Sequence, residues 1–147
     1  MIAEVLTTDL PDISHLIDTT VRHSIPLPAD DQHWLLAGIM ESLERWEAKP
    51  DAFLHIKYVA DEQIAGVLLL NDGWNLVNLF VAPTFHGQGI GRALVGAAAE
   101  HACARGGDAI RLNSSDFAVD FYRRLGFVQL GPGKDRPGGC VPMELTL

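Results

Sequence analysis

Apolar residues in the amino-terminal third of the chain recur every three or four positions, which is the period of an amphipathic helix. The spacing predicts one helix over residues 11–25, opened by Pro11 and closed before Pro26. It predicts a second helix over residues 30–48, ended by the Lys49-Pro50 pair. The apolar faces expected for these two helices consist of Ile13, Leu16, Ile17 and Val21, and of Trp34, Leu35, Ile39, Leu43 and Trp46.

Beyond residue 50 the helical spacing gives way to short apolar runs of strand length. Three runs follow one another, "AFLHIKYVA", "QIAGVLLL" and "WNLVNLFVA". They are separated by Asp61-Glu62 and by Asn71-Asp72-Gly73, which are residues typical of turns. The pattern therefore predicts an antiparallel meander between residues 52 and 82, and residues 2–6 predict one further short strand.

After the meander, helices and strands alternate. An alanine-rich helix is predicted over residues 89–105, followed by a strand at "AIRLN". A strand, a helix and a second strand joined by short loops indicate a parallel pair with a right-handed crossover. The remaining predicted elements are a helix over 115–125, a strand at "FVQLG" and a last strand over 141–147. The fold class expected is therefore α/β with a mixed sheet, in a single domain over residues 1–147.

Composition and charge narrow the classes of function. The longest obvious apolar run, "IAGVLLL", is far shorter than the ~20 residues that cross a bilayer, and no secretion signal opens the chain, so a cytoplasmic protein is expected. Cys103 and Cys140 provide neither a disulfide framework nor metal-ligand spacing, and no metal is predicted. The net charge of -8 argues against a nucleic-acid or anionic-membrane partner. A cationic small substrate would suit this charge better.

The segment "HGQGIG" places glycines where a strand gives way to a helix. A mononucleotide P-loop needs lysine and a hydroxyl residue after its last glycine, but Arg92 follows Gly91 here. A dinucleotide fingerprint fails because Arg92 or Leu94 takes the place of its third glycine. Two interpretations remain: a tight structural connection, or a diphosphate cradle of free N–H groups at a helix N-terminus, with Arg92 beside the anion.

The longer segment "LFVAPTFHGQGIGRALV" resembles the acetyl-CoA-binding motif of the GNAT superfamily of N-acetyltransferases. That motif has an apolar strand, Val-x-Pro and then Gln/Arg-x-x-Gly-x-Gly/Ala. The matching residues are Val81, Pro83, Gly89 and Gly91. His86 departs from the motif because it stands at the leading Gln/Arg position.

A second segment, "NSSDFAVDFYRRLGF", is similar to the family's Ala-x-x-x-Tyr-x-x-x-Gly-Phe. The matching residues are Ala118, Tyr122, Gly126 and Phe127. The resemblance covers residues 78–131 and implies a mostly antiparallel sheet of six to seven strands, a central splayed parallel pair and about four helices. Helices one and two would then border the acceptor pocket.

The resemblance implies that acetyl-CoA is the co-substrate and that the reaction is acetyl transfer to a primary amine of a small molecule or peptide. Its pantetheine arm would lie between the splayed strands, where the backbone of Phe80 and Val81 is expected to be unpaired. The pyrophosphate would take N–H groups between His86 and Arg92. The complete set of expected cofactor-binding residues is Phe80, Val81, His86, Gly87, Gln88, Gly89, Ile90, Gly91, Arg92, Asn113, Ser115 and Tyr122.

Tyr122 matches the position of the family's general acid, which assists departure of a thiolate with an ordinary pKa of about 8.5. Many relatives carry a glutamate base on the fourth strand, but this strand has no carboxylate, and Asn78 is expected to orient a water or the amide product. Alternative proton acceptors or substrate anchors are His23, His33, Glu41 and Glu44. A water relay would need no dedicated base.

The acceptor amine is not identified by the sequence. Trp34, Trp46 and Trp74 are candidates for an acceptor pocket, although at least two are expected in the core. A CoA-sensing or interaction module with the same fold and little catalysis is the alternative function. A homodimer through the last strand or the second helix is compatible with the sequence but has no specific pattern.

Overall fold

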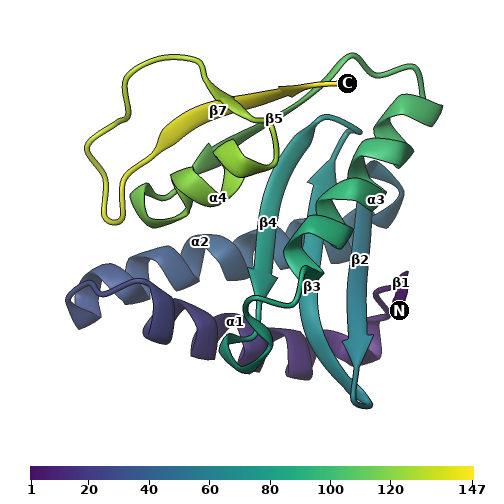
Figure 1. Ribbon diagram of the computed structural model, residues 1–147. Helices are drawn as coiled ribbons and strands as arrows, with labels where there is room; N and C mark the ends of the chain where they lie inside the picture. Colours follow the sequence, from purple (N-terminus) through teal and green to yellow (C-terminus); the bar gives the residue numbers. More distant parts are fainter.

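A computed structural model describes residues 1–147 and contains one seven-stranded sheet in the order β1-β2-β3-β4-β5-β7-β6 (Figure 1). The strands are β1 (Ile2–Glu4), β2 (Phe53–Ala60), β3 (Gln63–Asn71), β4 (Asn75–Val81), β5 (Ala109–Ser114), β6 (Val128–Gln129) and β7 (Val141–Thr146). Only β4 and β5 pair in parallel; the other neighbours are antiparallel. The predicted mixed sheet with a central parallel pair is confirmed.

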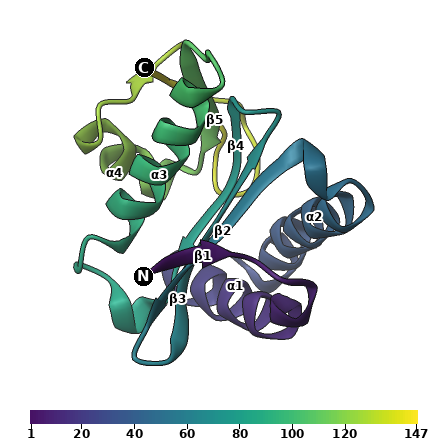
Figure 2. The ribbon, with the colours of Figure 1, turned by 90° about the vertical axis from the view of Figure 1, so that its right-hand side faces the viewer.

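Four helices cover the two faces of this sheet. They are α1 (Leu10–Ser24), α2 (Ala29–Ala48), α3 (Ile90–Ala104) and α4 (Val119–Arg124). Figure 2 shows α1 and α2 on one side of the sheet, with α3 and α4 on the other. None of the helices has the length and apolar character that a membrane crossing demands.

Each face of the sheet has its own apolar core. The four predicted core positions of α1 are buried, and they pack with Val67 and Leu69 of β3 and with Trp46 of α2. On the other face Leu94 of α3 is fully buried in a larger cluster that includes Tyr122 and Phe127. The helical spacing in the sequence therefore identified real buried faces.

Several expectations differ from the structure. Trp34 and Trp74 are about half exposed, so the prediction that at least two tryptophans lie in the core is wrong and only Trp46 is buried. The buried side of α2 is defined by Leu36, Leu43 and Trp46; Trp34, two residues before Leu36, lies about 200° around the helix from it.

The predicted helix over residues 115–125 is also shorter than expected. It opens with a 3-10 turn at Asp116–Ala118, and α4 begins only at Val119. The Asp116 N–H donates to the carbonyl of Gly138 at 2.8 Å, which ties this turn to the loop before β7. The β6 strand has two residues in place of the five predicted.

Strand β4 contains an irregularity in its pairing with β3. Leu69 pairs with Asn78 and Leu70 with Leu76, so Val77 has no partner on β3 and forms a bulge. The bulge turns Asn78 and Phe80 toward the α1–α2 face.

The parallel ladder between β4 and β5 covers only two residue pairs, Asn75 with Arg111 and Leu76 with Leu112. Beyond Leu76 the two strands diverge.

Candidate active site

The connection between β4 and α3 exposes main-chain donors. Gly87 and Gly89 both have φ of 78°, and a Cβ built at either position would meet no atom within 4 Å. The amide groups of residues 87–92 donate to no acceptor within the chain, whereas the amide of Ala93 already bonds to the carbonyl of Gly89. The segment is therefore a row of free N–H groups that ends in the first turn of a helix, an arrangement that favours anions.

Gly91 has a different role from its two neighbours. A Cβ at this position would lie 2.8 Å from Cζ of Phe121 on α4, closer than real Cβ contacts. Gly91 therefore permits α3 to approach α4. Gly91 therefore fits the interpretation as a tight structural connection, whereas Gly87 and Gly89 leave the free N–H groups that a diphosphate cradle requires.

The diverging strands leave backbone groups of β4 unpaired. The Ala82 N–H bonds to the carbonyl of Ala65 on β3, and bonds along an antiparallel ladder alternate. Phe80 therefore directs its N–H and C=O toward β3, whereas Leu79 and Val81 direct theirs toward the gap. The expectation of a free backbone is wrong for Phe80, whose side chain nevertheless lines the pocket. At Val81 it applies only to the N–H, because the carbonyl oxygen lies 2.7 Å from Nε2 of His86.

His86 folds back over this gap. Its Nε2 lies 2.7 Å from the carbonyl oxygen of Val81, so Nε2 carries the proton and donates it. The ring of His23 on α1 stands edge-on to it, with 6.5 Å between ring centroids. The residue that departs from the Gln/Arg of the motif thus uses its side chain to hold the cradle against the end of β4.

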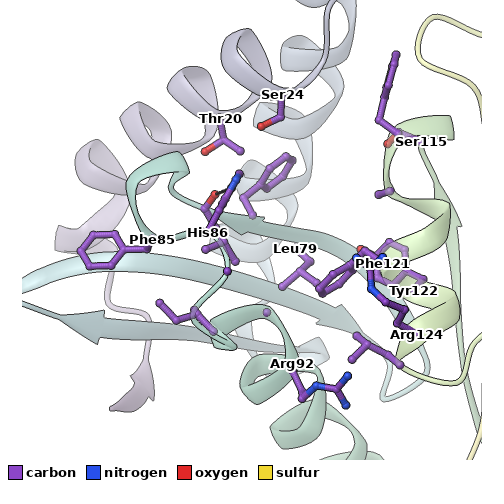
Figure 3. A pocket seen from close by; sticks show the side chains of 18 of the residues that line it. Thr20, Ser24, Leu79, Phe85, His86, Arg92, Ser115, Phe121, Tyr122 and Arg124 are labelled. Atoms are coloured by element: carbon purple, nitrogen blue, oxygen red, sulfur yellow. Dashed lines mark hydrogen bonds between the residues drawn. The ribbon is translucent and has the colours of Figure 1, made fainter.

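A pocket of about 610 Å³ occupies the gap (Figure 3). It is lined by β4, the cradle, α4, the 3-10 turn before α4 and the last turn of α1. Ten of the residues predicted to bind the cofactor line it: Phe80, Val81, His86, Gly87, Gly89, Ile90, Gly91, Arg92, Ser115 and Tyr122. Gln88 and Asn113 are exposed and lie outside the lining.

Tyr122 lies at the wall that α4 contributes to the pocket. Its ring is buried and packs edge-on against Phe121 and Phe127, with centroids 5.2 and 5.4 Å away. Burial raises the pKa of its hydroxyl well above the ordinary value. The phenol is therefore protonated at every physiological pH and is available as a hydrogen-bond donor.

The other predicted catalytic residue does not reach the pocket. Asn78 is 6% exposed, and its Nδ2 donates to Oγ of Ser42 on α2 at 2.8 Å. The Ser42 hydroxyl in turn donates to the carbonyl of Ile39. Asn78 thus belongs to a buried polar contact between sheet and helix.

The alternative proton acceptors His23, His33, Glu41 and Glu44 are exposed, and none lines the pocket. His86 does line the pocket, but the sequence predicts that it binds the cofactor and not that it accepts a proton. The tryptophans considered for the acceptor are absent from the lining as well.

Sequence reasoning missed several residues of the pocket. Arg124, at the end of α4, joins Arg92 from α3 at one end of the pocket, and neither forms an ion pair. Thr20 and Ser24 of α1 line another side. The only signal for Arg124 was its place two residues after Tyr122, and nothing in the spacing of α1 distinguished its two hydroxyls from solvated positions.

Comparison with solved structures identifies the fold as that of N-acetyltransferases. A GCN5-related N-acetyltransferase from Rhodopseudomonas palustris superposes with a TM-score of 0.85 at 18% identity, over 100% of this chain and 95% of the other. PaiA N-acetyltransferase from Thermoplasma acidophilum, solved with coenzyme A, gives 0.81 at 17% identity, over 100% and 98%. The ribosomal-protein-S18-alanine N-acetyltransferase from Escherichia coli gives 0.72 at 21% identity, over 99% and 92%.

At these identities the structural likeness establishes the fold alone. The family follows from the sequence, because the acetyltransferase (GNAT) domain matches residues 30–147. The chain therefore belongs to the GNAT acetyltransferase family. No curated protein matches it.

Proposed function

We propose that the protein is an N-acetyltransferase that moves the acetyl group of acetyl-CoA to a primary amine of a small molecule or peptide. The observation that carries the proposal is the gap between β4 and β5, which ends at a row of free amides over residues 87–92. A gap of this kind can receive an extended arm, and the amides can receive a diphosphate.

Two features of the pocket support coenzyme A as its ligand. The open-sided Gly87 and Gly89 leave room for a diphosphate to approach the backbone, and Arg92 adds a positive charge without a partner. Val81 and Leu79 face the gap as one edge of a ladder, so amide groups of the pantetheine arm would pair with them. The carbonyl of Val81 already accepts a hydrogen bond from His86. When the pantetheine arm binds, this bond would either remain or be replaced by one from the arm.

Tyr122 would serve the departing sulfur. When bound, acetyl-CoA supplies an activated acyl group, and the protein needs to hold it and stabilise the thiolate that departs. Because the pKa of Tyr122 lies above its ordinary value, the phenol remains a neutral donor, and at the pocket wall it would stabilise this charge. Solved relatives include one crystallised with coenzyme A and one that acetylates an alanine of a ribosomal protein, and both support this chemistry.

Thermal unfolding with and without acetyl-CoA tests the proposal. A ligand at 100 times its dissociation constant stabilises the folded state by about 2.7 kcal/mol, which is a clear rise in Tm. Gly89→Asp is expected to abolish the rise, because it places a negative side chain at a left-handed position in the cradle. The exposed helical Gly96→Ala serves as the matched control and should retain it. Absence of any shift at millimolar acetyl-CoA would refute the proposal.

A CoA-binding module with little catalysis is the second candidate. The observation that favours it is the placement of Asn78, which bonds to Ser42 and leaves the pocket without a polar side chain from the fourth strand. Release of free thiol with a panel of amines separates the two functions. Tight binding of acetyl-CoA with thiol release at the background rate would favour the module.

A further inference from the structure

The last turn of α1 forms a side of the pocket that the proposed cofactor site does not use. Thr20, Val21, Ser24 and Ile25 line it there. In Figure 3 Thr20 and Ser24 lie along the upper edge of the pocket, whereas Arg92 lies at the lower edge. The acceptor would therefore be received at the α1 side, away from the two arginines.

The hydroxyl of Ser24 is the unexplained polar group at this side. Its Oγ is buried and has no hydrogen-bond partner. Thr20, one turn earlier, satisfies its own hydroxyl by donating to the carbonyl of Leu16 at 2.7 Å. A buried unpaired hydroxyl destabilises the folded state. Because Ser24 lines the pocket, rotation about its Cα–Cβ bond to another staggered position would bring the hydroxyl to a ligand that satisfies it.

The backbone adds a second preference at the same place. The helix ends with the Ile25 N–H bonded to the carbonyl of Val21. Pro26 and Pro28 have no N–H, so they cannot cap the carbonyls of Arg22 and Ser24. The carboxyl end of α1 therefore keeps a partial negative charge, which favours an amino group over an anion.

The remaining lining limits the charge of the acceptor. Arg92, Arg124 and His86 are the side chains of the pocket that can carry a positive charge, and no Asp or Glu lines it. Next to Ser24 in the chain the lining is apolar, with Val21 and Ile25, and the half-exposed ring of Phe117 also lines the pocket. A second ammonium group on the acceptor would meet apolar atoms or cations.

We infer that the acceptor is a primary amine with a single positive charge on an apolar body, and that Ser24 positions its nitrogen. This inference rests on the proposed function. The ammonium first gives one proton to solvent, which leaves a neutral nitrogen with a lone pair. That lone pair forms the new bond to the acetyl carbon, and the carbon–sulfur bond breaks with its electron pair on sulfur. The nitrogen then loses a second proton and the sulfur takes up one. The Ser24 hydroxyl accepts an N–H bond and leaves the lone pair free for attack.

The test measures thiol release with 2-phenylethylamine as the apolar monoamine and with spermidine and kanamycin as polycations. We expect kcat/KM to be at least about tenfold higher for 2-phenylethylamine. Ser24→Ala should lower kcat/KM for it by about fivefold to tenfold, mainly through KM, since one hydrogen bond is lost. Thr19→Ala, an exposed position on the same helix, is the matched control and should behave as wild type.

Two further measurements separate a role of Ser24 in positioning the acceptor from a structural role. Ser24→Ala should keep the wild-type affinity for acetyl-CoA, and its Tm should not fall, because the substitution removes an unpaired group. The inference is overturned if either polycation is preferred, if the monoamine is not turned over, or if Ser24→Ala leaves kcat/KM unchanged. In each of these cases acetyl-CoA binding would leave the proposed function intact. Failure of acetyl-CoA to bind overturns both.

Discussion

The buried His55 gives the fold a measurable dependence on pH. It lies on β2 with 6% exposure, its ring stands edge-on to Trp46 at 4.5 Å between centroids, and its Nδ1 has no partner. Burial lowers its pKa from 6.5 to about 4, and the nearby Asp9 carboxylate opposes this only in part. His55→Phe replaces the imidazole by a ring of similar shape that cannot be protonated.

The magnitude follows from proton linkage. The unfolded chain binds a proton at His55 below pH 6.5, whereas the folded chain resists it down to about pH 4. The contribution of the neutral His55 to the free energy of unfolding is therefore fully present above pH 6.5 and is lost as the pH falls toward 4. A difference of about 2.5 pKa units corresponds to about 3.4 kcal/mol in full, of which about 2 kcal/mol is lost at pH 5.

Urea unfolding of wild type and His55→Phe at pH 7 and pH 5 measures the part of the free energy of unfolding that depends on the protonation of His55. The wild-type free energy of unfolding should fall by about 2 kcal/mol more than that of the variant. His101, whose pKa is also lowered by burial, contributes with the same sign but is present in both proteins and cancels. The exposed His15→Gln is the control and should follow wild type. Equal losses in wild type and His55→Phe would show that His55 is not held neutral by burial.

Three substitutions test the packing and chemistry around the pocket. Gly91→Ala should cost about 1–3 kcal/mol in urea unfolding and weaken acetyl-CoA binding, since its Cβ would lie 2.8 Å from Phe121; stability equal to wild type would contradict the contact. Tyr122→Phe should lower kcat by about 10²-fold or more at unchanged acetyl-CoA affinity, measured by thiol release and calorimetry; normal turnover would remove its catalytic role. Ser42→Ala should cost about 1–3 kcal/mol because Asn78 loses its buried acceptor, while calorimetry should find acetyl-CoA affinity unchanged; a loss of affinity would instead link Asn78 to the pocket.

The order of elements and much of the pocket were readable from the sequence because they depend on local signals. Helical spacing identified the buried face of α1, and the glycines marked the free amides of the cradle. Gly87 and Gly89 require a left-handed backbone with open space around it, a demand that shows in the choice of residue. The order strand, helix, strand with short loops predicted the parallel pairing of β4 and β5, which is confirmed.

What the sequence could not supply depends on partners distant in the chain. Asn78 looked like a catalytic substitute on its strand, but its partner Ser42 is 36 residues away, and the bulge at Val77 decides which face Asn78 takes. Trp34 had an apolar side chain at a plausible helical position, yet no element covers it. The unpaired hydroxyl of Ser24 is visible only once α1 is placed against the pocket.

The central claim is that the free amides of residues 87–92 bind the diphosphate of coenzyme A. Titration of the ¹⁵N-labelled protein with coenzyme A, followed through its amide resonances, tests this most directly. The account predicts that the amide signals of Gly87 to Arg92 shift strongly and saturate together, and that this shift is lost in Gly89→Asp. Saturable binding that leaves these signals in place, or no binding at millimolar coenzyme A, would contradict it.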